Sequence, residues 1–175
     1  YGLDRYKKPM LPTLLRELAK VDGISWIRVL YSYPKYFTDE LIDVFATEPK
    51  VVKYVDLPLQ HAHDAVLRSM NRPDTREGVE KLIKKLREHI PGVAIRSTFI
   101  VGFPGETDTH YQALRSFVEE QRFDKVGIFT YSEEEDTPAA VMPHKVPEEV
   151  MQERYHDLMS LQSKISEEIN IGLEN

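Results

Sequence analysis

Apolar and polar positions alternate along the chain between helix-like and strand-like patterns. In the helix-like segments, apolar residues recur three or four positions apart, as in Val79, Leu82, Ile83 and Leu86. In the strand-like segments, β-branched and aromatic residues form short runs bounded by turn residues. The sequence predicts helices over 11–21, 37–48, 74–90, 108–121 and 147–169, and strands over 26–33, 51–60, 93–101 and 125–132.

This order of elements, one helix followed by four strand–helix units, is typical of a parallel sheet covered by helices. A complete barrel of eight such units needs about 250 residues, and this chain has 175. We therefore expect an α/β fold with about four parallel strands, either a small open sheet or an arc of a partial barrel. At the helix starts, Asp74 with Glu77 has the form of a capping box, and Thr107 or Asp108 is placed to cap the following helix.

Polar side chains share one face of three predicted strands. Arg96 and Thr98 have the same parity on one strand, Asp56 and Gln60 on another, and Arg28 has the parity of the mixed face of the first. A strand buried on both faces is nearly all apolar, and a buried charge needs a partner or solvent. The pattern favours an inner face that holds a polar ligand. An ion-pair network of Arg28, Asp56 and Arg96 is the alternative, and both can hold together.

Residues 100–107, Ile-Val-Gly-Phe-Pro-Gly-Glu-Thr, stand where a predicted strand ends and a helix begins. Ligands of α/β proteins bind at the carboxyl ends of strands, and glycine lets the backbone approach them. The segment has neither the Walker A nor the G-x-G-x-x-G pattern, so an ordinary turn remains the alternative.

The segment after the second predicted strand carries further candidates. His61 and His63 lie beside Asp64, a spacing compatible with a metal site, but we favour hydrogen-bonding roles for these histidines. Arg72 follows Gln60 by twelve residues and could return over the strand ends to hold a carboxylate. A surface position before the next helix is the alternative for Arg72.

Composition narrows the classes of function. The net charge is −6 with a pI near 5.6, which argues against strong direct binding of nucleic acid by this segment. The chain has no cysteine, so it holds no disulfide, thiolate metal site or self-contained iron–sulfur cluster. No apolar run approaches about 18 residues, so no membrane span is expected. The acidic run 133–136 is read as a solvated loop, the alternative being contact with a basic partner.

Several segments together resemble the radical S-adenosylmethionine methylthiotransferases over essentially the whole chain. They are 56–61 (Asp-Leu-Pro-Leu-Gln-His), 70–73 (Met-Asn-Arg-Pro), 99–106, 131–132 and 137–140 (Thr-Pro-Ala-Ala). The segments 130–137 and 152–155 resemble the branch that modifies an aspartate of ribosomal protein S-twelve. The sibling branch, which modifies tRNA adenosine, usually has Ser-Gly at the place of His61-Ala62. Asp136 stands where the family typically has a glycine, a difference that can change a turn.

The resemblance implies a radical-SAM partial barrel of six strand–helix units. Residues 1–175 would be the C-terminal part of the barrel domain, without its cluster-binding start, the N-terminal methylthiotransferase domain and the TRAM domain. A [4Fe-4S] cluster on a Cys-x3-Cys-x2-Cys loop outside this chain would cleave S-adenosylmethionine to a 5′-deoxyadenosyl radical. A second cluster, on the N-terminal domain, would supply or hold the sulfur. The lack of cysteine agrees with that placement.

The resemblance also implies that this segment forms half of the S-adenosylmethionine pocket. Gln60 and Arg72 would hold the methionine part, Thr98 would lie at the ribose, and Ile100 and Gly102 along the adenine.

Two further positions complete the candidate site, which contains no catalytic residue and no metal ligand. The backbone around Tyr131 would bind the adenine edge, and Arg96 is added because of its strand parity. The cofactor-binding candidates are Gln60, Arg72, Arg96, Thr98, Ile100, Gly102 and Tyr131.

The expected function of the complete protein is addition of a methylthio group to an aspartate β-carbon of ribosomal protein S-twelve. It would be a cytoplasmic enzyme that needs an electron donor for its cluster, and the acidic balance suits a basic ribosomal-protein substrate. The alternatives are a tRNA adenosine methylthiotransferase of the same family, or a non-catalytic α/β binding module that uses 102–106 for an anion. The 175 residues alone are expected to be inactive.

Overall fold

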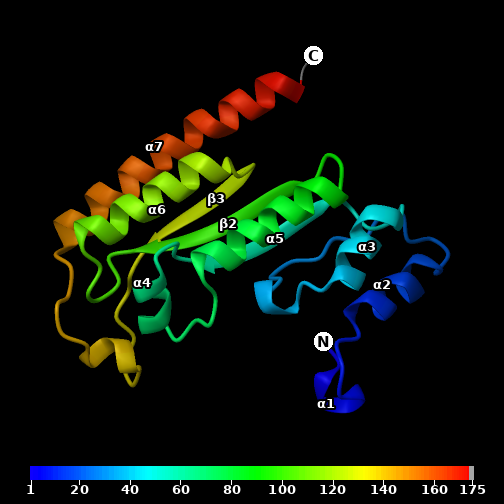
Figure 1. The fold of residues 1–175 in the computed structure, drawn as a ribbon, viewed down its shortest axis with the longest axis horizontal. Coiled ribbons are helices and arrows are strands. Elements are labelled where there is room, and N and C mark those ends of the chain that lie inside the picture. Colours follow the sequence, from blue (N-terminus) through cyan, green and yellow to red (C-terminus); the bar gives the residue numbers. More distant parts are fainter. Residues whose placement is uncertain (174–175) are drawn as a thin grey trace.

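The structure is a computed structural model that describes residues 1–173. Its centre is a parallel sheet in the order β1 (Tyr54–Gln60), β2 (Ala94–Val101) and β3 (Lys125–Thr130) (Figure 1). Helices α5 (Arg76–His89) and α6 (Asp108–Gln121) return the chain from the end of one strand to the start of the next. The predicted fold class, a parallel sheet with covering helices, is confirmed.

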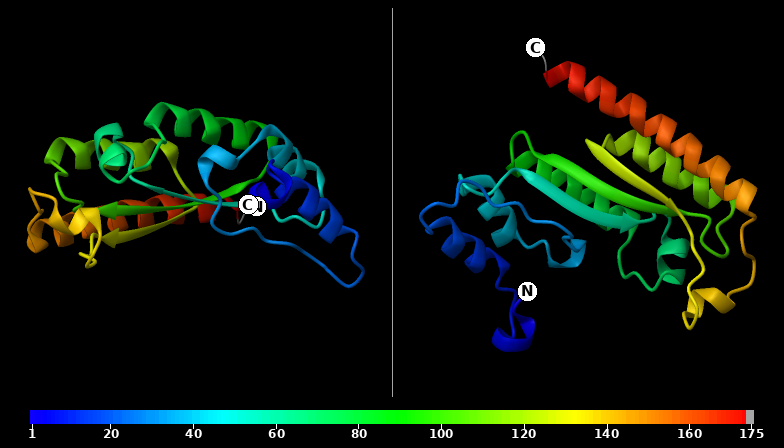
Figure 2. Two further views of the ribbon diagram at one scale, coloured as in Figure 1. Left: turned by 90° about the horizontal axis from the view of Figure 1, so that it is seen from below. Right: turned by 180° about the vertical axis from the view of Figure 1, so that it is seen from behind.

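Further helices surround this centre. The long α7 (Glu148–Leu173) runs beside β3 and α6, and α2 packs on α3 at the other end of the molecule (Figures 1 and 2). These remaining elements are α1 (Leu3–Tyr6), α2 (Leu11–Ala19), η1 (Pro34–Tyr36), α3 (Asp39–Thr47), α4 (Asp64–Ser69) and η2 (Pro138–Val141). In residues 1–173, no helix has the length and apolar character needed to cross a membrane.

Most predicted elements are found within a few residues of their expected bounds, but the predicted strand 26–33 is not a strand. It runs beside β1 and makes one isolated bridge, Ile27 to Val51, and one backbone hydrogen bond from Ser32 N to Asp56 O at 2.8 Å. Between these two contacts Tyr31 adopts a φ of 57°, which breaks the extended path. The run of β-forming residues therefore gives an edge segment without a regular ladder.

Two helix starts were predicted, and one is confirmed. Thr107 caps α6: its hydroxyl accepts from His110 N, and the His110 ring accepts from Thr107 N. At α5 the cap is Thr75, whose hydroxyl accepts from Gly78 N, so the capping box predicted for Asp74 and Glu77 is wrong. Thr75 and Asp74 are both good N-cap residues, and sequence preference alone did not separate the two neighbours.

The two faces of the sheet have different roles. Helices α5 and α6 cover one face, and the buried strand residues of that face form the core, among them Leu57, Ile95 and Phe99 (Figure 2). In the described part of the chain the other face is open, and Phe129 on it is 58% exposed. The predicted division into an apolar and a mixed face is confirmed for β2, whose burial alternates along the strand. In β1 the alternation is interrupted at Asp56, which is buried although it belongs to the mixed face.

The charged residues of the open face pair with each other in part. Arg96 Nη1 donates to Asp56 Oδ1 at 3.0 Å, and the Asp56 side chain is 2% exposed. Arg28 does not join this ion pair; its guanidinium lies over the ring of Tyr54, 3.8 Å from the centroid. The open face thus carries an ion pair in which Asp56 is buried and Arg96 is one-third exposed.

Candidate functional site

A cavity of about 790 Å³ lies at the carboxyl ends of the strands. Its floor comes from the ends of the three strands, and its walls come from the turn after α4 and the segment that leads into η2. The lining residues are Gln60, Ser69, Met70, Asn71, Arg72, Thr98, Ile100, Phe103, Phe129, Thr130, Tyr131, Ser132, Thr137, Pro138 and Ala139. This is the edge at which parallel α/β sheets bind ligands.

The cavity has polar and apolar parts side by side. On the sheet floor, Thr98 lies in register with Gly127, and Ile100 lies in register with Phe129. Gly127 adds no side chain of its own beside the Thr98 hydroxyl, while Ile100 and Phe129 form an apolar surface. A ligand with a flat apolar group beside hydroxyl groups suits this floor.

Two buried polar atoms at the cavity have no hydrogen-bond partner within residues 1–173. They are Arg72 Nε and the Tyr131 hydroxyl. Arg72 is held by a 2.6 Å hydrogen bond from Nη2 to Pro58 O and by stacking over Tyr33 at 4.8 Å. An unsatisfied buried polar group costs about 1–3 kcal/mol, so a hydrogen-bond partner at either atom would be stabilising.

Gln60 enters the cavity from a strained turn. Its φ is 71°, and His61 N donates to Leu59 O at 2.9 Å across it, the geometry of a classic γ-turn. The pairing of β1 with β2 is irregular between Leu57 and Gln60. Such conformations persist only where surrounding contacts enforce them, and they concentrate at functional sites.

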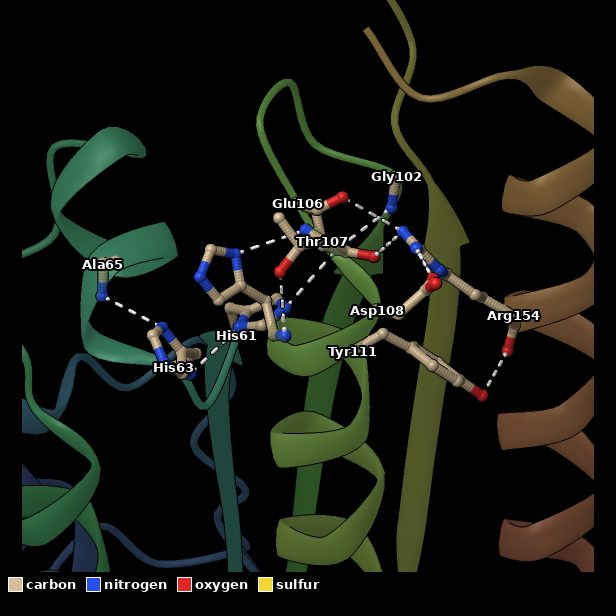
Figure 3. A network of polar contacts seen from close by, with 10 residues as sticks. His61, His63, Ala65, Gly102, Glu106, Thr107, Asp108, Tyr111 and Arg154 are labelled. Atoms are coloured by element: carbon tan, nitrogen blue, oxygen red, sulfur yellow. Dashed lines mark hydrogen bonds and ion pairs between the residues drawn. The ribbon is translucent and has the colours of Figure 1, made fainter. Parts of the chain in front are cut away.

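A buried polar network ties this turn to the rest of the molecule (Figure 3). His61 Nε2 lies 3.4 Å from Glu106 Oε2, and both side chains are fully buried. The same Glu106 oxygen accepts from Gly102 N at 3.1 Å, and Glu106 Oε1 accepts from Arg154 Nη1 at 2.7 Å. The network therefore joins the turn after β1, the turn after β2 and helix α7.

The histidines act as hydrogen-bonding groups in this structure. His61 Nδ1 accepts from His63 N, and His63 Nδ1 accepts from Ala65 N and caps α4. Burial and the neighbouring ring of His110, 4.2 Å away, lower the pKa of His63. Within residues 1–173, no three histidine or carboxylate side chains come together as metal ligands would.

Tyr111 in α6 borders the same network. Burial and a hydrogen bond to Asp157 raise the pKa of its hydroxyl, and the hydroxyl also donates to Arg154 O at 3.3 Å. This hydroxyl stays protonated near neutral pH and fixes the backbone of α7 beside Arg154.

The structure brings five of the seven sequence candidates together. Those that line the cavity are Gln60, Arg72, Thr98, Ile100 and Tyr131. Arg96 lies outside the lining and pairs with Asp56 further along the strands. Gly102 also lies outside it, with a φ of 80°, facing Met151 of α7.

Sequence reasoning missed several lining residues. Phe129 could have been found, because the parity argument used for the other strands places it next to Ile100 on the open face. Phe103 was quoted only as part of a motif. The residues 137–139 were likewise quoted only as part of a motif, and they belong to the cap and start of η2, which is too short to give a periodic signal.

One sequence departure has a structural explanation. Asp136, at the place where the family typically has a glycine, adopts a φ of 64°. Glycine is preferred in this left-handed region, and aspartate is among the few other residues that tolerate it. Asp136 therefore adopts the left-handed conformation that a glycine would favour in the turn before η2.

A known family model matches more than half of the chain. The family model described as "Radical SAM superfamily" matches residues 2–118. The chain belongs to the radical SAM superfamily. The matched region contains β1, β2 and the turn with Gln60, and the radical-SAM part of the resemblance inferred from the sequence is thereby confirmed.

Curated relatives agree with this radical SAM assignment. The chain is 57% identical over 166 residues to the ribosomal protein uS12 methylthiotransferase RimO of Heliobacterium modesticaldum. The alignment covers 95% of this chain and 36% of that protein. It is 52% identical to the RimO proteins of Desulforamulus reducens and Geobacter sulfurreducens. The chain thus spans little more than a third of the length of these relatives.

Solved structures share the radical SAM fold. Coproporphyrinogen III oxidase HemN from Escherichia coli, a radical SAM enzyme, aligns with a TM-score of 0.68 at 18% identity, over 89% of this chain and 36% of that one. The methyltransferase TsrM from Kitasatospora setae aligns with a TM-score of 0.62 at 20% identity, over 80% of this chain and 28% of that one. The sheet and its helices therefore follow the arrangement of known radical SAM proteins.

Proposed function

We propose that this chain is the C-terminal part of the barrel domain of a radical-SAM methylthiotransferase that modifies an aspartate of ribosomal protein uS12. The main support is the identity of 57% over 166 residues to a protein of that name. The chain covers 36% of that relative, so the activity belongs to the complete gene product.

The cavity fits half of a S-adenosylmethionine site. The Arg72 guanidinium has a free, buried Nε for the carboxylate of the methionine part, and Gln60 lies beside it on the lining. The Thr98 hydroxyl is placed for the ribose diol. Ile100 and Phe129 offer an apolar surface for a purine, and the free Tyr131 hydroxyl adds a polar group at its edge.

The residues of this chain do not fit an iron–sulfur cluster, because the chain contains no cysteine. The ligands of a [4Fe-4S] cluster would lie outside these residues, and the cluster would need an electron donor. When bound and reduced, such a cluster supplies the electron that cleaves S-adenosylmethionine. The residues described above then serve to bind and orient the cofactor and to exclude water from it.

We also propose a cytoplasmic location and no strong direct binding of nucleic acid by this segment. The net charge of −6 suits a basic ribosomal protein better than a polyanion.

Binding of S-adenosylmethionine tests the site. The complete gene product, purified anaerobically with its clusters, is titrated calorimetrically as wild type, Arg72→Ala and Gln60→Ala. Loss of a charged hydrogen bond costs about 1.5–3 kcal/mol, so Arg72→Ala should bind roughly 10- to 150-fold more weakly. Arg68→Ala is the matched control, since Arg68 is an exposed arginine one turn earlier and outside the lining. Wild-type affinity in both Arg72→Ala and Gln60→Ala refutes the site.

The substrate is tested separately. The same protein is incubated with uS12 and with unmodified tRNA, and the products are analysed by mass spectrometry. A methylthio group on an aspartate of uS12 is the expected product, whereas methylthio-adenosine in the tRNA would assign the chain to the sibling enzyme.

A further inference from the structure

We propose that the buried triad His61–Glu106–Arg154 is a positioning device that holds the Gln60 turn in its strained shape and so sets the affinity for the ligand of the cavity. The inference rests on the proposed function, because that ligand is S-adenosylmethionine. None of the three residues lines the cavity, so they act through their neighbours.

The three side chains of the triad are buried and in contact with one another through Glu106. The His61 and Glu106 side chains are fully buried, and that of Arg154 is 6% exposed. His61 Nδ1 accepts from His63 N, so the proton of the ring is on Nε2, which lies 3.4 Å from Glu106 Oε2 without forming a hydrogen bond. Glu106 faces a guanidinium on its other oxygen. A buried carboxylate needs a charged partner and hydrogen bonds to offset its loss of hydration, and Glu106 has Arg154 and Gly102 N.

The triad joins parts of the chain that are far apart in sequence. His61 follows the end of β1, Glu106 follows the end of β2, and Arg154 comes from α7 (Figure 3). Arg154 also donates from Nη2 to Asp108 Oδ1 at 2.6 Å, at the start of α6. The turn after β1 is therefore fastened to a rigid helical frame.

Gln60 is the residue through which the triad reaches the ligand. Gln60 directly precedes His61. Its positive φ is a backbone conformation that is unfavourable for any residue except glycine. His61 Nδ1 is held by His63 N, and the buried ring lies against Glu106, so the contacts around residue 61 oppose relaxation of the turn. The strain is thus maintained where it directs the Gln60 side chain to the cavity.

The test is a double-mutant cycle on S-adenosylmethionine affinity in the complete, cluster-loaded gene product. His61→Leu replaces the ring by an apolar side chain of similar size and so removes both ring contacts. It should weaken binding about tenfold. If His61 acts through Gln60, the variant Gln60→Ala/His61→Leu binds no more weakly than Gln60→Ala alone. Additive losses overturn the proposal, and so does unchanged affinity in His61→Leu.

A second pair of variants covers the case that His61→Leu does not fold. Glu106→Gln/Arg154→Met removes both buried charges together, which avoids leaving one charge unpaired. It should also bind about tenfold more weakly and show the same lack of additivity with Gln60→Ala. Wild-type affinity in this double variant overturns the proposal.

A matched control separates positioning from stability. Gln162 is a buried polar residue on the same helix α7 and donates to Phe123 O at 2.8 Å, away from the cavity. Gln162→Leu should lower the thermal midpoint and leave S-adenosylmethionine affinity unchanged. Affinity loss in Gln162→Leu equal to that in His61→Leu overturns the proposal as well. If the wild type itself fails to bind S-adenosylmethionine, the proposed function falls before this inference is reached.

Discussion

Replacement of Gly102 by alanine should destabilise the protein for two separable reasons. Gly102 has a φ of 80°, and a Cβ built there would lie 2.1 Å from Met151 Cγ and 2.3 Å from Met151 Sδ. The left-handed backbone costs an L-residue about 1–2 kcal/mol. Overpacking of a tight contact adds about 1–3 kcal/mol. Gly102→Ala should therefore lose about 2–5 kcal/mol of stability.

Gly105→Ala isolates the backbone part of this cost. Gly105 has a φ of 84°, close to that of Gly102, but a Cβ there would meet nothing within 4 Å. The difference between the two variants then measures the contact with Met151 alone. For a domain of this size about 2–4 °C of thermal midpoint corresponds to 1 kcal/mol, so the two midpoints should differ by roughly 2–12 °C.

The assay is thermal denaturation of the complete gene product, followed in the transition that contains this domain. The double variant Gly102→Ala/Met151→Ala adds a decisive comparison, because removal of the Met151 side chain frees the space that the new methyl group needs. Its loss should be smaller than the sum of the single losses by more than about 1 kcal/mol. Equal midpoints for Gly102→Ala and Gly105→Ala, or strict additivity in the double variant, refute the reasoning.

Three further predictions follow from the helix caps and the open face. Thr107→Ala should lose about 0.5–2 kcal/mol of stability, and Thr107→Ser should recover most of it, as measured by thermal midpoint. The folded protein lowers the pKa of His63 below 6.5, so the unfolded chain binds the proton first and stability falls as pH drops through that value. His63→Asn keeps a cap, and the fall in midpoint between about pH 7.5 and 5.5 should shrink; an unchanged fall contradicts this. Asp56→Asn should cost about 1–3 kcal/mol, because Arg96 loses its ion-pair partner but remains one-third exposed to water.

The regular parts of the fold were predictable because each has a local cause. The apolar periodicity of α5 and the alternation in β2 are visible over consecutive residues, and both were confirmed within two residues. The segment 26–33 shows the limit of such reasoning. Its residues favour a strand, but a ladder also needs a partner in register, and the turn at Tyr31 prevents it.

The site was predictable in part for the same reason. Gln60, Thr98 and Ile100 follow from strand parity, and Arg72 follows from the family resemblance. The network behind the site did not follow, because Arg154 comes from a helix 48 residues beyond Glu106 and no periodicity links them. Glu106 itself looked like a turn residue, although it is fully buried.

The alternation of the strands explains how support and binding are divided at this site. Thr98 and Ile100 face the cavity, while Phe99 and Val101, which alternate with them, are buried in the core. At the end of β1, Gln60 lines the cavity and His61 is buried in the triad, and here the γ-turn at Gln60 separates the two side chains. Neighbouring residues of β2 thus have different roles, because successive side chains of an extended strand point to opposite faces of the sheet. Substitutions on the cavity side should therefore change ligand affinity with little effect on stability, and those on the helix side should lower stability. His61 is the exception. It is buried away from the cavity, but its substitution should also change ligand affinity, because it acts through the strained turn at Gln60.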